Sequence, residues 1–199
     1  MNTSEHRILA LYKRLMDEAR RRIDAIEMLV NRETGLEARF AREAAYLQLR
    51  MICEIIAVGC VVAHDGLAEL DASKELRKAF AADRIVNALS SLHDRFYPQP
   101  IRVERETAGH ISVRDADVEH LSKDELKALY RSCGNALHRG TPAKIVAGEK
   151  LEADWISNVM HNSQLAANLL SSHALVMRGD ERAIFANFIS GEVWIGDAL

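Results

Sequence analysis

Apolar residues recur every three or four positions over the first thirty residues, which is the period of an α-helix. The pattern predicts a first helix that runs from a cap at Thr3 or Ser4 to about Asn31. A second helix is predicted from about Leu36 to Ala63, amphipathic in its first half and apolar on every side in its second. Helices that are apolar all round lie at the centre of a bundle. We therefore expect the second half of this helix to form the core.

Three further helices are predicted from the same period. They run from Ser73 to about Leu92, from Ser122 to about Leu137, and from near Leu151 to about Val176. The fourth has the clearest start, because Ser122 and Glu125 form the Ser-x-x-Glu pattern of a capping box. The fifth is assigned by its spacing of apolar positions, which includes His173 and Val176 near its end.

Two segments alternate apolar and polar residues instead, which is the period of a β-strand. One covers residues 100–115 approximately, where Ile101 and Val103 begin an exposed hairpin. The other is a β tail at about residues 183–196, with two short strands that could pair with the hairpin. The sequence thus predicts a mainly α protein, a bundle of about five helices with a small antiparallel hairpin sheet. We expect one domain over residues 1–199.

Composition narrows the class of protein without indicating its chemistry. Of the 199 residues, 48% are hydrophobic and 28% are charged, which is typical of a folded globular domain and not of a disordered chain. The formal net charge of -3 argues against a protein that coats nucleic acid through overall charge. A local basic cleft remains compatible with this balance.

The apolar and cysteine patterns indicate in which cellular compartment the protein is expected. The most apolar run, Met51–Ala63, has thirteen residues and contains Glu54, so it is too short to span a bilayer. The N-terminal residues have no signal-peptide pattern, and Cys53, Cys60 and Cys133 form no CxxC pair. We expect a cytoplasmic protein with reduced thiols and no membrane span.

Arg131 and His138 are the first candidates for chemistry. Seven residues apart, they differ by about 20° from two full turns, so they share a face if the helix persists. Gly134 leaves the backbone between them open to a close approach, and Asn135 adds an amide. A guanidinium can bind phosphoryl oxygens, and an imidazole can move a proton near neutral pH. The alternative is that these residues only interact with the last carbonyls of the helix.

The stretch from Arg131 to His138, followed by Gly140, resembles the motif of the HEPN superfamily, in which Arg and His enclose four to six residues near a helix end. These are helical domains of prokaryotic defence and toxin systems. The resemblance implies a metal-independent endoribonuclease, in which His138 acts on the ribose 2′-hydroxyl and Arg131 stabilises charge on the scissile phosphate. It also implies a homodimer whose two motifs share one cleft. Since some members are non-catalytic, a helical interaction or RNA-binding domain is the alternative.

Arg50 and Glu54 are ionisable residues one helical turn apart on the most apolar helix. Such groups are seldom buried unless they are paired. One interpretation is an ion pair, with each other or with another helix, that fixes the register of the bundle. The other places Glu54 against the motif, where it would orient His138 or bind Arg131. HEPN-like domains also have an acidic residue on an earlier helix, so the resemblance favours the second interpretation.

Basic residues near the hairpin and the motif are candidate contacts to an RNA backbone, although a solvated face is the plainer interpretation. They are Arg102, Arg105, Arg114, Arg139 and Lys144. No metal site is indicated, because His161 and His173 have no His or carboxylate four residues further on. Phosphate-binding glycine loops and zinc-protease motifs are absent from the sequence too. We therefore expect no metal and no cofactor.

Overall fold

The computed structural model describes residues 3–65, 81–105, 111–138, 154–177, 179, 181–188 and 190–198. Its helices are α1 (Thr3–Val30), α2 (Ala38–Asp65), α4 (Ala82–Ser90), α5 (Lys123–Leu137) and α7 (Trp155–Ser171). Its strands are β1 (Gln99–Arg105), β2 (Ile111–Asp115), β3 (Ser172–Val176), β4 (Arg182–Asn187) and β5 (Val193–Asp197). The predicted helix start at Ser73 and the start near Leu151 lie outside the described residues.

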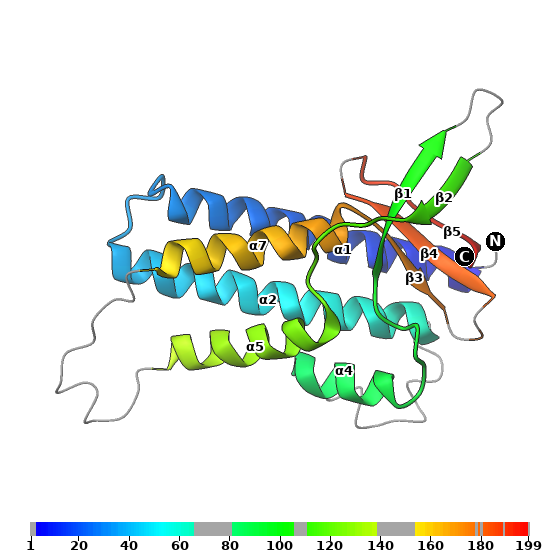
Figure 1. Ribbon diagram of the computed structural model, residues 1–199, viewed down its shortest axis with the longest axis horizontal. Helices are drawn as coiled ribbons and strands as arrows, with labels where there is room; N and C mark the ends of the chain where they lie inside the picture. Colours follow the sequence, from blue (N-terminus) through cyan, green and yellow to red (C-terminus); the bar gives the residue numbers. More distant parts are fainter. Residues whose placement is uncertain are drawn as a thin grey trace.

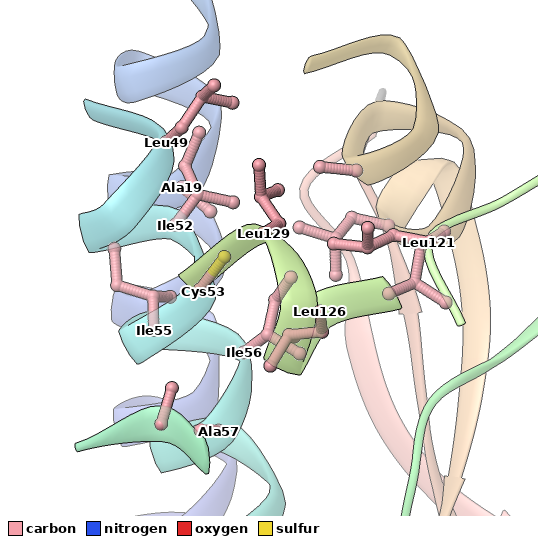
Figure 2. Packing of buried hydrophobic residues seen from close by; sticks show 14 of the residues in the cluster. Ala19, Leu49, Ile52, Cys53, Ile55, Ile56, Ala57, Leu121, Leu126 and Leu129 are labelled. Atoms are coloured by element: carbon pink, nitrogen blue, oxygen red, sulfur yellow. The ribbon is translucent and has the colours of Figure 1, made fainter. Parts of the chain in front are cut away.

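Helix α2 lies at the centre of the helical layer, between α1 and α7 on one side and α4 and α5 on the other (Figure 1). Leu49, Ile52 and Ile56 of α2 are almost fully buried. They pack with Leu126 and Leu129 of α5 in the main hydrophobic cluster (Figure 2). The second half of α2 is therefore core, as its apolar pattern predicted.

Helix α2 is also long and apolar enough to cross a bilayer, judged by length and composition alone. Of its most apolar stretch, 61% is buried inside the protein. Core helices of folded domains pass the same test of length and hydropathy, so the result is weak support for a membrane span.

The strands form one curled antiparallel sheet in the order β2-β1-β3-β4-β5 (Figure 1). Strand β3 is central, because it pairs with β1 through Pro100 and His173 and with β4 along its whole length. The sheet lies at one end of the helices, beside the first half of α1. Side-chain contacts join the two, since Lys13 donates to the Gly191 carbonyl and Arg182 pairs with Glu5.

The predicted fold class, a helical bundle with a small hairpin sheet, is therefore wrong. The error begins at residues 172–176, for which the apolar period predicts the end of the fifth helix and which instead form β3. Residues 173–176 are all buried, because one face of β3 packs on the helices and the other packs in a second apolar cluster. A strand buried on both faces has no alternation of polar and apolar residues, so its sequence is indistinguishable from the end of an apolar helix.

Helix α5, which carries the motif, begins as predicted. The Ser122 hydroxyl accepts a hydrogen bond from the Glu125 backbone N–H, and the Glu125 carboxylate accepts from the Ser122 backbone N–H at 2.9 Å. These bonds satisfy two donors that a helix start leaves open. The Ser122 hydroxyl also donates to the Glu125 carboxylate at 2.6 Å, and this bond, followed by the one from the Ser122 backbone, lowers the pKa of the Glu125 carboxyl.

Replacement of Ser122 by alanine is expected to lower the free energy of unfolding by about 1 kcal/mol, because the cap of α5 is lost. Urea denaturation followed by circular dichroism measures this change. The matched control is Ser132→Ala, since Ser132 is exposed within the same helix and alanine is the better helix former. Equal stability of S122A and the wild type would show that the capping box does not stabilise α5.

Candidate functional site

Helix α5 ends at Leu137, so His138 is the residue that caps it and not a residue within it. The backbone at His138 has φ -81° and ψ 135°. The direction of a side chain from its backbone depends on φ, and this φ is close to the helical value. The His138 side chain therefore leaves α5 in nearly the direction that a continued helix would give, although the chain itself turns away after it.

The outer face of α5 carries the predicted motif residues. Arg131, Asn135 and His138 are all exposed, and 64% of the Arg131 side chain is accessible to solvent. The inner face consists of Leu126, Leu129, Tyr130 and Cys133, which are buried against α2. The helix thus presents a cation, an amide and an imidazole to solvent at spacings of four and three residues.

Asp83 of α4 is the acidic partner of Arg131. Its Oδ2 lies 3.5 Å from the Arg131 Nε. An ion pair at this level of exposure contributes less than about 1 kcal/mol, so it orients the guanidinium without sequestering it. One of the two interpretations of the sequence gave Glu54 as the partner of Arg131. The sequence did not predict Asp83, because nothing in it indicates that the first turn of α4 meets α5.

Glu54 has different partners from those predicted under the functional interpretation. Its Oε1 lies 3.4 Å from the Nε of Arg50, and its charge raises the pKa of the Tyr130 hydroxyl. The same hydroxyl accepts a bond of 2.6 Å from Nη2 of Arg50. Arg50 and Glu54 thus form the ion pair of the first interpretation, and Tyr130 extends this pair to α5.

The guanidinium of Arg50 lies next to Gly134. A Cβ atom on this residue would lie 3.0 Å from Nη1 of Arg50, so the absent side chain makes room for the Arg50 guanidinium. The sequence predicted an open backbone for an approaching ligand at this position. In the structure it is a side chain of α2 that makes the close approach.

Burial and charge set the ionisation of two groups beneath the motif. Burial raises the pKa of the Tyr130 hydroxyl, Arg50 lowers it, and Glu54 raises it again. Burial also raises the pKa of the Cys133 thiol to about 12, against a smaller opposing effect of Arg50. Cys133 therefore stays a protonated core thiol at neutral pH. Because only a thiolate is an effective nucleophile, Cys133 is not a candidate nucleophile.

Of the predicted RNA contacts, the two whose side chains are described, Arg102 and Arg114, do not share a surface with the motif. Arg102 and Arg114 are exposed and face each other across β1 and β2. Their hairpin is at the sheet end of the molecule, whereas the His138 end of α5 points to the opposite end (Figure 1). Arg105 lies in β1, but its side chain is not among the described parts of the structure. Arg139, Gly140 and Lys144 also lie outside the described residues.

Within the described ranges, no group of three or more His, Cys, Asp or Glu side chains is placed to hold a metal ion. The three cysteines are free and buried. His173, for which the sequence spacing indicates no metal site, lies in the core and is fully buried.

Comparison with protein-family models finds no match, and comparisons with curated proteins and with solved structures find none either.

Proposed function

We propose that this chain is a metal-independent endoribonuclease and that Arg131, Asn135 and His138 are its catalytic residues. The observation that supports the proposal is the exposure of these three side chains on one face of α5. The imidazole of His138 can take a proton from a ribose hydroxyl. The Arg131 guanidinium pairs with Asp83 through Nε, and 64% of its side chain is exposed, so phosphate oxygens can reach it.

The proposed reaction is an internal transfer at phosphorus. His138 removes the proton of the 2′-hydroxyl, and the 2′ oxygen then attacks the adjacent phosphorus. The bond from phosphorus to the 5′ oxygen breaks, and that oxygen takes up a proton. Arg131 and the Asn135 amide stabilise the negative charge on the non-bridging oxygens. The products are a 2′,3′-cyclic phosphate and a 5′-hydroxyl.

We also propose that the active form is a homodimer. The reaction uses one group to remove a proton and another to supply one, whereas each motif provides a single imidazole. Two motifs that face each other across a two-fold axis would provide both groups. RNA is the proposed partner and the cytoplasm the proposed compartment, with a role as a toxin or defence effector. A cognate antitoxin is not identified.

The test is an RNA cleavage assay with EDTA present. Purified protein is incubated with a labelled single-stranded RNA and with the same RNA carrying 2′-O-methyl groups. We expect cleavage of the first substrate only, unaffected by EDTA, with 2′,3′-cyclic phosphate ends detected by mass spectrometry. Cleavage of the 2′-O-methyl RNA, or activity that EDTA abolishes, would contradict the proposed mechanism.

A second candidate function is a non-catalytic interaction or RNA-binding domain. The ion pair from Arg131 to Asp83 and the bond from Arg50 to Tyr130 support it, because they connect α5 to α4 and α2 as structural residues do. This candidate predicts no cleavage of any RNA. It also predicts that substitutions at Arg131 lower the melting temperature and change no enzymatic activity.

A further inference from the structure

The Arg50 side chain reaches from α2 to the half of α5 that carries the motif. Its Nε faces the Glu54 carboxylate at 3.4 Å, and its Nη2 donates to the Tyr130 hydroxyl at 2.6 Å. Its Cζ lies 4.2 Å from the centre of the Tyr130 ring. Its Nη1 lies beside Gly134, 3.0 Å from the position that a Cβ would take. One planar group therefore contacts α5 at two positions a helical turn apart.

Partial burial and the planar shape of the Arg50 guanidinium make its contact with α5 specific. Only 28% of the Arg50 side chain and 22% of the Glu54 side chain are exposed, so water screens their interaction less than it would at the surface. The guanidinium is planar and always charged, and it both stacks on an aromatic ring and donates from a fixed fork. A lysine at the same position would keep the charge and lose the fork.

Tyr130 and Gly134 are each followed directly by a motif residue, Arg131 and Asn135. In a helix, the direction of one side chain fixes that of the next, because successive residues are rotated by about 100°. A rotation of α5 about its axis would move Tyr130 away from Arg50 or push the backbone near Gly134 into it. The Arg50 contacts thus set the direction in which Arg131 and Asn135 project.

We propose that Arg50 is a positioning residue of the cleavage site, which fixes the rotation of α5 through Tyr130 and Gly134. The inference rests on the proposed nuclease function. In this arrangement Glu54 acts indirectly, because it holds the Arg50 guanidinium and does not contact Arg131. The exposed residues Arg131, Asn135 and His138 perform the chemistry, and Arg50 keeps two of them in place.

Arg50→Lys and Gly134→Ala test the proposal, with Arg42→Lys as the control. Arg42 also lies on α2 over a tyrosine ring, but that ring belongs to Tyr46 of the same helix. We expect R50K to lower kcat at least about tenfold and to change KM less than about twofold, because positioning acts on the transition state. R42K should keep the kcat of the wild type.

Gly134→Ala separates positioning from stability. Alanine favours the helix by about 1 kcal/mol over glycine, so the variant should be as stable as the wild type or more so. Its Cβ would displace the Arg50 guanidinium by a few tenths of an ångström, since 3.0 Å is too close for an ordinary contact. We expect a fall in kcat without a fall in melting temperature, which a purely structural role for Arg50 would not produce.

Hydrogen exchange of the α5 amides provides a readout that does not depend on activity. In R50K, the amide hydrogens of residues 131–137 should exchange at least about tenfold faster than in the wild type, because α5 loses contacts with α2. If the wild type cleaves RNA and both R50K and G134A keep its kcat, the Arg50 proposal is overturned and the nuclease proposal stands. If the wild type cleaves no RNA, the nuclease proposal fails. Unchanged exchange in R50K would then overturn the contact role of Arg50 as well.

Discussion

His138→Ala is expected to lower the rate of RNA cleavage by about 10²- to 10⁴-fold, the usual contribution of a positioned general base. The side chain is exposed and follows the last residue of α5, so its removal should leave the fold intact. Single-turnover cleavage with saturating protein measures the loss. Circular dichroism and the melting temperature check that the variant is folded.

The matched control for this experiment is His161→Ala. His161 is also an exposed histidine, but it lies on α7 and not on α5. It should keep the cleavage rate of the wild type. Cleavage by H138A at the wild-type rate would show that His138 is not the general base, even if the chain is a nuclease.

Acidification from pH 7.5 to pH 4.5 is expected to remove about 2 to 3 kcal/mol of stability through His173 alone. His173 is fully buried at the junction of α1 and the sheet, where its Nε2 accepts a bond of 2.6 Å from the Tyr12 hydroxyl. Its Nδ1 lies 3.1 Å from the Leu170 carbonyl and donates to it. This arrangement requires a neutral ring, and burial lowers the pKa of His173 to about 4.

The sign follows from the two protonation states. In the unfolded chain the His173 pKa is about 6.5, so below that pH the unfolded state binds a proton that the folded state excludes. The stabilising contribution is complete above pH 6.5 and is lost progressively as the pH falls toward 4. Below that value both states are protonated and no further loss arises from this group.

Urea denaturation at several pH values measures the effect, with His173→Gln as the comparison. The glutamine variant keeps a polar side chain that does not titrate, and all other ionisable groups are common to both proteins. We expect the variant to be less stable at pH 7.5 and the difference from the wild type to shrink by about 2 to 3 kcal/mol at pH 4.5. A difference that stays constant with pH would show that His173 is not buried in its neutral form.

The sequence predicted best those structural features that depend on residues close together in the chain. The period of apolar residues predicted α1 and α2 to within a few residues, and the pairing of Ser122 with Glu125 predicted the start of α5. The exposure of Arg131, Asn135 and His138 also agrees with their place on the polar face of that helix. These features follow from spacing along a single helix, so the sequence alone can indicate them.

Contacts between segments that are far apart in the chain could not be predicted from this local spacing. Strand β3 differs from a helix end only through its pairing with β1 and β4. Asp83 reaches Arg131 only because α4 packs beside α5.

Local chemistry therefore determined which helices form, where α5 begins, and which side chains it presents to solvent. The tertiary structure decided that residues 172–176 form a strand, that Arg50 binds both Glu54 and Tyr130, and that Gly134 accommodates a guanidinium. The physical reason is the range of the interactions. Helical period and capping act over three or four residues, whereas strand pairing and buried ion pairs depend on segments brought together by the whole fold.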